Sequence, residues 1–305
     1  PWVAKARTEL GGTVWVSSNA NNAITETPTA LQQAQDSAEQ SIVLLKNDKP
    51  AAAANPLLPL KVPASGTYKV AAVGYEAHPN SLFLGGYSSI QAAAGAANNV
   101  DSYTGVKAAI QGINSGAQVD YFSGFTGGTS ASGLTTVDPN QIASIAAGNY
   151  NAVIVVVGTD SSTGAEDRDR TTLALPGAQA SLISQVEAAN PNTIVYMETM
   201  GEVDTSPFAS TTSALLWSSY NGQRQGIALA DNLLGKTNPG GHLPFTWYTS
   251  MSQIPAITDY NLTPTATTDG RTYMYFTGDI TYPFGYGLSY ANFSYSNLTV
   301  NGSTA

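Results

Sequence analysis

Short apolar runs, each bounded by turn-forming residues, recur through the middle of the chain. The longest reads AVIVVV, and the others are also rich in valine, alanine, leucine and isoleucine. An unbroken apolar run of this kind predicts a strand that is buried on both faces of a sheet. We therefore expect strands at residues 69–73, 117–122, 152–157, 193–197 and 214–217.

Between these runs, apolar residues recur every three or four positions, which is the pattern of an amphipathic helix. The first such segment runs from Thr29 to Leu45, with Thr29 as its N-cap, and continues through SIVLLKND into a buried strand or turn. The alternation of strands and helices is typical of a doubly wound sheet. The predicted fold class is α/β, a mostly parallel sheet with helices on both faces; the further helices are expected at 100–115, 139–147, 178–189 and 225–234.

The composition of the sequence changes after Asn238. A Gly/Pro-rich stretch, NPGGHLPFTW, is followed by short aromatic pieces, and eight tyrosines fall between Tyr248 and Tyr295. We expect an irregular, aromatic-rich closing segment here. The final run, FSYSNLTV, alternates like a half-buried strand and is interpreted as the opening of another β module.

Composition supports a large globular fold and excludes several partners. The chain has 305 residues, 42% of them apolar, which is enough for a substantial core. Its net charge is −9 without an offsetting basic patch, so we expect no nucleic-acid partner. No apolar run reaches the length of about 18 residues that a membrane-spanning helix needs, so no membrane partner is expected.

The remaining composition bears on location and cofactors. The few lysines and many Ser, Thr, Asn and Tyr residues are typical of secreted proteins, so we expect an extracellular protein. Without cysteine, no disulfide can form. His78 and His242 are the only histidines and lack metal-ligand spacing, so no metal is expected. Neither GxGxxG nor a P-loop follows a strand, which disfavours a nucleotide-binding, flavodoxin-like domain; no cofactor is expected.

A concentration of charge follows the strand expected at 152–157. Gly158 ends that strand, and five consecutive charged residues stand in the next loop although only 11% of the chain is charged: Glu166, Asp167, Arg168, Asp169 and Arg170. Open α/β sheets place their ligand sites beyond the carboxyl ends of strands. The loop is either a solvated surface neutralised by ion pairs or the holder of a carboxyl group fixed for acid/base chemistry.

Two further carboxyl groups follow the strand expected at 193–197. Glu198 and Glu202 therefore lie at the same carboxyl edge of the predicted sheet. We interpret them as surface residues in the first place and as alternative acids in the second.

Several stretches resemble glycoside hydrolases of family 3, and they occur in family order over nearly the whole chain. They are AQDSAEQSIVLLKND at 34–48, LLPL at 57–60, KVAAVG at 69–74, GGYS at 85–88, AEDRDRTTLALPG at 165–177, NPGGHLPFTW at 238–247 and YPFGYGLSYANFSYSN at 282–297. The combination of GRTYMYF with YPFGYGLSY resembles the β-xylosidase branch.

The resemblance implies the second domain of a retaining exo-β-glycosidase that releases xylose or glucose from oligosaccharides, with one half of its active site. In that family a (β/α)8 barrel carries the aspartate nucleophile, and an α/β sandwich supplies the general acid/base. This chain resembles only the sandwich, so the implied partner is an upstream barrel. The expected divisions are a linker and leading helix at 1–45, the sandwich at 46–250, a closing segment at 251–290, and the start of a fibronectin-like module at 291–305.

The resemblance also implies roles for single residues. Glu166 is the candidate acid/base, and the alternative is a structural carboxylate paired with Arg168 or Arg170. Many relatives carry a glutamate two positions earlier, where this chain has Gly164, so Glu166 is the only glutamate of the loop. Asp169 and Arg170 are expected to brace the loop as an ion pair. Arg168 and Tyr87 are the candidate sugar-binding residues. The alternative function is that of a non-catalytic carbohydrate-binding or scaffold fragment.

Overall fold

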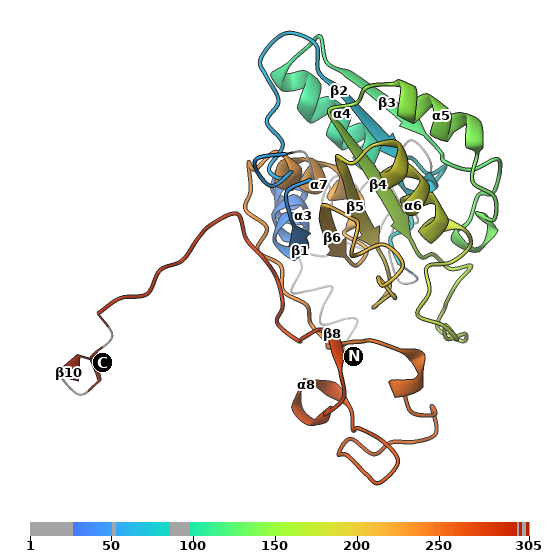
Figure 1. The fold of residues 1–305 in the computed structure, drawn as a ribbon, viewed down its shortest axis with the longest axis vertical. Helices are drawn as coiled ribbons and strands as arrows, with labels where there is room; N and C mark the ends of the chain where they lie inside the picture. Colours follow the sequence, from blue (N-terminus) through green and yellow to red (C-terminus); the bar gives the residue numbers. More distant parts are fainter. Residues whose placement is uncertain (1–26, 51–52, 86–97, 298, 301–302, 305) are drawn as a thin grey trace, which may run out of the picture.

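A six-stranded sheet forms the centre of the computed structural model, which describes residues 27–50, 53–85, 98–297, 299–300 and 303–304 (Figure 1). The strand order is β1-β6-β5-β4-β2-β3, and β1 is antiparallel to β6 while the other neighbours are parallel. The strands are β1 Val43–Asn47, β2 Lys69–Val73, β3 Gln118–Phe122, β4 Ala152–Gly158, β5 Thr193–Glu198 and β6 Ala214–Ser218.

The five parallel strands have the doubly wound order in which ligand sites form where the winding reverses. Counted among themselves in chain order, they follow 2-1-3-4-5, so the reversal lies between β2 and β4. Every parallel strand predicted from an apolar run is present, with ends that differ by no more than one residue. The predicted mostly parallel α/β sheet is therefore confirmed.

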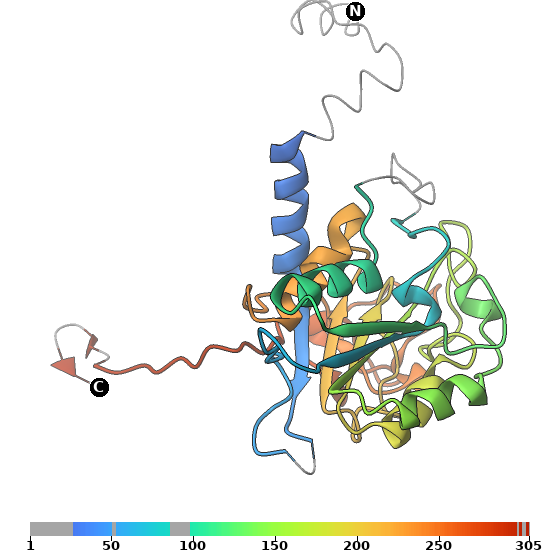
Figure 2. The ribbon, with the colours of Figure 1, turned by 90° about the horizontal axis from the view of Figure 1, so that it is seen from above.

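Helices cover both faces of the sheet (Figures 1 and 2). Alternate residues of β4 enter opposite cores, with Ile154 facing the layer of α3, α4 and α7 and Val155 facing the layer of α5 and α6. This is the two-residue period of a strand that is buried on both sides. The helices are α3 Pro28–Ser41, α4 Ser102–Ile113, α5 Pro139–Ala147, α6 Gln179–Ala189 and α7 Gln225–Leu233, with 3-10 turns at Tyr75–Ala77, Ala131–Gly133, Gly222–Arg224 and Met251–Gln253.

The prediction for the first helix was wrong at both ends. Thr27, not Thr29, is the N-cap: its Oγ1 accepts from the backbone N of Ala30 at 3.2 Å, and a proline follows at the first helical position. The helix ends at Ser41, before the expected Leu45, and the buried strand expected in SIVLLKND is confirmed as β1 but begins already at Val43. Four consecutive buried residues begin at Ile42, and a helix with one covered face cannot bury such a run. The expected boundary after residue 45 falls inside this strand.

The closing segment packs back onto β1 and β6. Two short antiparallel strands, β7 Trp247–Tyr248 and β8 Ile280–Tyr282, flank the one-turn helix α8 Thr272–Tyr275. Trp247 is fully buried, and its ring meets Trp217 of β6 edge to face at 5.8 Å. Near its end, Tyr286 donates through its hydroxyl to the carbonyl of Leu45 at 3.1 Å.

The half-buried strand predicted for FSYSNLTV was wrong over its first part. Residues 293–297 have no strand, and Phe293 and Tyr295 are 74% and 95% exposed. Only β9 Thr299–Val300 is a strand, and it pairs with β10 Ser303–Thr304. The aromatic residues of this segment are exposed because it extends away from the sheet (Figure 1) and does not pack on the described core.

Helices α4 and α7 approach so closely that their crossing requires glycine on both sides. A Cβ added to Gly105 would lie 2.1 Å from the carbonyl oxygen of Gly226, and one added to Gly226 would lie 1.8 Å from that of Asp101. Gly112, in the same helix as Gly105, has nothing within 4 Å of such a Cβ. The two glycines of α4 therefore serve as a matched pair for a test of this contact.

We expect Gly105→Ala to lower the free energy of unfolding by about 1–3 kcal/mol or more, because the added methyl forces the two helices apart. Gly112→Ala is expected to raise it by about 0.5–1 kcal/mol, since alanine restricts the unfolded chain and fits an exposed helix. Urea unfolding followed by circular dichroism measures both. Shifts of the same sign and size would contradict the close crossing.

Candidate functional site

A cleft of about 1060 Å³ opens where β4 and β5 end. Because these strands are parallel neighbours, the loops that follow them emerge side by side at one edge of the sheet. Charged residues 166–170 line the cleft, and Met251, Ile254 and Ile257 of the closing segment contribute apolar lining. The charged loop thus lies in a concave site, as its position after β4 predicted.

Glu166 stands at the tip of a tight turn in this loop. Backbone hydrogen bonds run both ways between Ala165 and Arg168, from Ala165 N at 2.9 Å and from Arg168 N at 3.0 Å, so Glu166 and Asp167 project between them. Both side chains are exposed. Arg168 is exposed too, and its guanidinium donates to the carbonyl of Ser161, which fixes the base of the turn. The structure therefore brings Glu166 and Arg168 to the same cleft.

The expected ion pair between Asp169 and Arg170 was wrong. Among the ion pairs of the described residues, none lies in this loop. Arg170 instead donates through Nη2 to the backbone carbonyl of Glu202 at 2.8 Å. Its side chain runs past Gly164 and Gly201: a Cβ on either would lie 3.4 Å from an Arg170 atom. Arg170 therefore ties the loop after β4 to the loop after β5.

Glu202 connects this pair of loops to β7. Its Oε2 accepts from the backbone N of Tyr248 at 2.9 Å. Burial raises the pKa of this carboxyl to about 7, against the opposing influence of the Tyr248 N–H and of the Arg170 charge. The burial of Arg170 likewise lowers the pKa of its guanidinium, while the Glu202 carboxylate acts in the opposite direction. Glu202 lines the cleft together with Glu166.

The surface role expected for Glu198 was wrong, because this residue is only 6% exposed. Its Oε2 accepts from Nε2 of Gln225 at 3.1 Å, and burial first and the nearby Glu76 second raise its pKa well above the usual range. Glu76 follows β2 at the reversal of the winding, and burial followed by Asp160 raises its pKa to about 8. Its position directly after an apolar run was the signal for Glu76 in the sequence.

The cleft contains an aromatic pair that the sequence did not point to. Tyr220 and Phe83 line it and meet edge to face, with ring centroids 4.7 Å apart. The hydroxyl of Tyr220 donates to the carbonyl of Thr159 at 3.0 Å, so the ring is held at the end of β4. Tyr87, the predicted sugar-stacking residue, lies outside the described residues.

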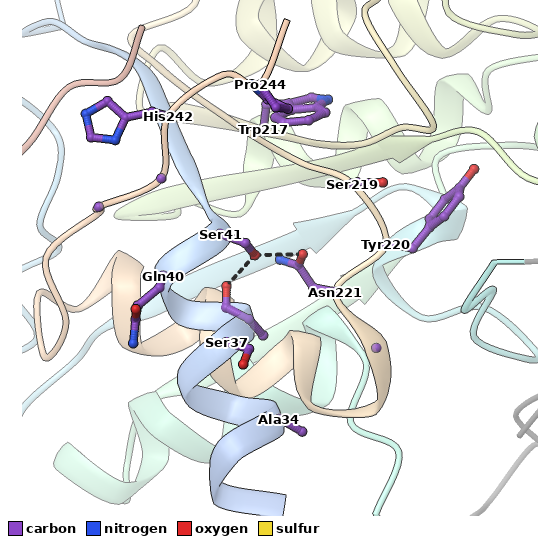
Figure 3. Close-up of a pocket in the computed structure, with 14 residues that line it drawn as sticks. Ala34, Ser37, Gln40, Ser41, Trp217, Ser219, Tyr220, Asn221, His242 and Pro244 are labelled. Atoms are coloured by element: carbon purple, nitrogen blue, oxygen red, sulfur yellow. Dashed lines mark hydrogen bonds between the residues drawn. The ribbon is translucent and has the colours of Figure 1, made fainter. Parts of the chain in front are cut away.

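A second cavity, of about 660 Å³, lies beside α3 (Figure 3). Its walls come from the last turns of α3, the turn after β6 and residues 240–244, and Ser41 donates to Oδ1 of Asn221 across it at 2.9 Å. His242 and the indole of Trp217 lie at its far side. The described lining includes no carboxylate, so the paired carboxyl groups of a retaining glycosidase are not found there.

Among the described residues, no group of three or more His, Cys, Asp or Glu side chains could hold a metal ion. In the same residues, no helix has the length and apolar character needed to cross a membrane. His78, one of the two histidines, instead bonds through Nδ1 to Oδ2 of Asp101 at 2.8 Å.

Comparison with known proteins gives a consistent set of relatives. The sequence model of the glycosyl hydrolase family 3 C-terminal domain matches residues 42–290. β-D-Xylosidase 1 of Arabidopsis thaliana is 33% identical over 279 residues, which are 88% of this chain and 32% of the relative. A probable exo-1,4-β-xylosidase of Aspergillus fumigatus is 35% identical, with 89% of this chain and 32% of the relative covered.

Solved structures show the same likeness. A GH3 exo-β-xylosidase determined with a xylobiose aziridine activity-based probe is 31% identical, with a TM-score of 0.67 over 87% of this chain and 32% of that one. The GH3 β-glucosidase of Bifidobacterium adolescentis is 26% identical, with a TM-score of 0.65 over 87% of this chain and 36% of that one. The chain thus spans about a third of the length of the relatives that it matches.

The raised pKa of Glu202 predicts a pH-dependent contribution to stability. The folded protein keeps the proton up to about pH 7, whereas the unfolded chain loses it near the ordinary carboxyl pKa of 4.5, so stability decreases as the pH rises between these values. Glu202→Gln keeps an acceptor for Tyr248 but removes the titration. From about pH 5 to about pH 8, we expect the free energy of unfolding of the wild type to fall by about 1–2 kcal/mol relative to that of this variant. The figure is smaller than the full pKa shift implies because the carboxyl group is partly exposed.

Thermal unfolding of both proteins across this pH range measures the difference. Glu166→Gln, at an exposed position in the same cleft, controls for the loss of one negative charge. Parallel stability curves for the wild type and Glu202→Gln would contradict the raised pKa.

Proposed function

The chain belongs to glycosyl hydrolase family 3, whose C-terminal domain it carries, and on that premise we propose that it is the acid/base-bearing domain of a retaining exo-β-glycosidase. The proposed substrates are oligosaccharides with terminal β-linked xylose or glucose. The observation that carries the proposal is the exposed Glu166 at the tip of a turn whose base is anchored to the sheet edge. Xylosidases and glucosidases among the relatives support the substrate class.

The proposed partner is an upstream (β/α)8 barrel of the same precursor. Retaining glycosidases use two carboxyl groups roughly 5–5.5 Å apart, one as nucleophile and one as acid/base. The chain covers only about a third of its relatives' length, so we assign the nucleophilic aspartate to the remainder. We keep the proposed division into a leading segment, a sandwich, a closing segment and the start of a further module.

Glu166 is a better candidate for the general acid/base than Glu202. The carboxylate of Glu202 is engaged by the Tyr248 N–H, and its backbone carbonyl holds Arg170, so this residue has a fixed place in the architecture. Glu166 is free to approach a glycosidic oxygen presented from outside the domain. We assign the binding of the sugar to Arg168, which belongs to the same turn, and to Tyr87.

The two chemical steps use Glu166 in opposite directions. In the first, its carboxyl donates a proton to the glycosidic oxygen while the C1–O bond breaks and the aspartate of the barrel bonds to C1. In the second, its carboxylate takes a proton from water, whose oxygen bonds to C1 as the aspartate leaves. Retention of the β configuration follows from the two inversions. The proposed place of action is extracellular, where polymeric plant sugars are met.

Residues 1–305 alone should not hydrolyse β-glycosides, because one of the two carboxyl groups is proposed to belong to another domain. We expect no saturable release of p-nitrophenol from p-nitrophenyl β-xyloside or β-glucoside. The full-length precursor, purified in parallel, is the positive control. Saturable turnover by the isolated chain, free of any companion protein, would refute the division of the active site.

In the full-length enzyme, Glu166→Ala should lower kcat on natural oligosaccharides by about 10²–10⁴-fold, the usual contribution of general acid–base catalysis. An aryl glycoside with an acidic phenol needs no proton to leave, so the glycosyl-enzyme should still form and then accumulate. Azide should restore turnover and yield the β-glycosyl azide, since a small anion attacks without a general base. Mass spectrometry of the enzyme and of the product measures both effects.

Asp169→Ala is the matched control, because it removes an exposed carboxylate from the same loop. Any decrease in its kcat relative to the wild type should be the same on both substrate types, and azide should not increase its turnover. If Glu166→Ala behaves like this control, or loses activity equally on both substrates with a lower melting temperature, the role of acid/base passes to Glu202.

A further inference from the structure

Arg170 fastens the turn of residues 165–168, here called the Glu166 turn, to the rest of the domain. Its side chain is only partly exposed, and its Nη2 donates to the backbone carbonyl of Glu202 at 2.8 Å. On the way it passes Gly164, which precedes the turn: a Cβ added there would lie 3.4 Å from Cγ of Arg170. Arg170 therefore contacts both ends of the segment whose tip is Glu166.

The carbonyl that accepts from Arg170 belongs to a segment that is fastened on both sides. Backbone N–H groups before and after Glu202 donate to the loop that follows β4, so this carbonyl has a fixed place at the edge of the sheet. The guanidinium thereby places the Glu166 turn relative to that edge. The two fastening bonds run from Met200 N to Oγ1 of Thr159 at 2.9 Å and from Asp204 N to the carbonyl of Leu173 at 2.7 Å.

The carboxyl group of Glu202 does not pair with this guanidinium in the described part of the chain. Its Oε2 accepts from the N–H of Tyr248 in β7 at 2.9 Å. Arg271, the cation that the closing segment contributes to the cleft, donates to two backbone carbonyls of its own segment. Arg170 is thus the cation that an ionised Glu202 would attract. The other ionisable groups that line the cleft are Glu166, Asp167, Arg168, Asp169 and Tyr220.

We propose that Arg170 and Glu202 are positioning residues for the proposed acid/base: the hydrogen bond between them holds the Glu166 turn where its carboxyl group reaches a glycosidic oxygen. Neither residue touches the reacting atoms in this role, which rests on the proposed function. Its basis is geometric, because the guanidinium contacts both ends of the turn and binds an acceptor that is fixed at the sheet edge.

The same arrangement makes the position of the turn depend on the charge of Glu202. A planar guanidinium pairs best with a carboxylate, which it can bind through two parallel hydrogen bonds. Burial raises the pKa of the Glu202 carboxyl to about 7. Below this pH the neutral carboxyl leaves Arg170 on the carbonyl, and above it the carboxylate competes for the guanidinium. The positioning is therefore present below about pH 7 and is lost as the pH rises through this value.

The full-length precursor tests the positioning role through kcat/KM, which reports the glycosylation step. Natural oligosaccharides need the proton of Glu166 in this step, whereas an aryl glycoside with an acidic phenol does not. Arg170→Lys keeps the charge but loses the planar fork. Its kcat/KM on the oligosaccharide should fall by roughly 10–100-fold, since a displacement of about 1 Å costs up to about 10²-fold. On the aryl glycoside, kcat/KM should stay close to the wild-type value.

Arg271→Lys is the matched control. Arg271 also lines the cleft and donates to backbone carbonyls, but it lies outside the Glu166 turn. Any loss that it causes should be equal on both substrates. Equal losses on both substrates in Arg170→Lys would overturn the positioning role and leave a purely structural one.

Glu202→Gln provides a gain of activity that a structural role does not produce, and it serves where Arg170→Lys fails to fold. Glutamine keeps an acceptor for Tyr248 but does not ionise. On the oligosaccharide, this variant should match the wild type below about pH 6 and exceed its kcat/KM by up to roughly tenfold near pH 8, where about nine tenths of the wild-type carboxyl groups are ionised. Both proteins need the Glu166 proton, so their ratio isolates Glu202. A ratio that is independent of pH would overturn the proposal.

Glu166→Ala with azide, measured in parallel, separates this proposal from the proposed function. If azide rescues Glu166→Ala while the ratio of Glu202→Gln to wild type is independent of pH, only the positioning role fails. If Glu202→Gln instead loses its activity on the oligosaccharide at every pH, and azide restores its turnover of the aryl glycoside, Glu202 is itself the acid/base. Both proposals then fail.

Discussion

The burial of β4 on both faces is the constraint on which the rest of the structure depends. All seven residues of Ala152–Gly158 are buried, so helices must cover both sides of the sheet. The strand lies between β2 and β5 and is parallel to both, which brings three carboxyl ends to one edge. At Gly158 a side chain would meet the carbonyl oxygen of Glu198 at 2.7 Å, so the sheet is still closely packed where it ends. The polar loops can only emerge beyond that edge.

Local pattern was sufficient for the parallel strands because four of them are short, mostly apolar runs and the fifth, β3, alternates apolar and polar residues. It failed at β1, since Leu31, Ala34, Ala38 and Ile42 continue a helical spacing into a stretch whose burial comes from distant partners. Val43 pairs with Trp217, and Leu44 is bridged to Leu288, and neither contact is visible in a short window of sequence. Tertiary packing therefore decided where α3 ends.

Some features of the candidate site could likewise be predicted from the sequence, and others depend on contacts between distant residues. The cleft beyond β4 and its exposed turn were predictable, because they follow from the strand order and from the run of charges. The partner of Arg170 was not predictable: its neighbour in sequence, Asp169, was the obvious candidate, but the guanidinium donates to the carbonyl of Glu202, 32 positions away. Glu198 was likewise assigned to the surface, since the sequence does not show that Gln225 and Tyr220 cover the end of β5.

Three glutamates at one sheet edge occupy three different environments, and environment, more than residue type, assigns their chemistry. Glu198 is buried, Glu202 is partly buried and held by backbone groups, and Glu166 is exposed on an anchored turn. A general acid needs a low-dielectric surrounding, which Glu166 lacks in this domain. In the proposed glycosidase, the docked barrel and its substrate would cover the turn and supply that surrounding. The turn is anchored within this domain, and the proposal assigns the covering of Glu166 to the missing partner.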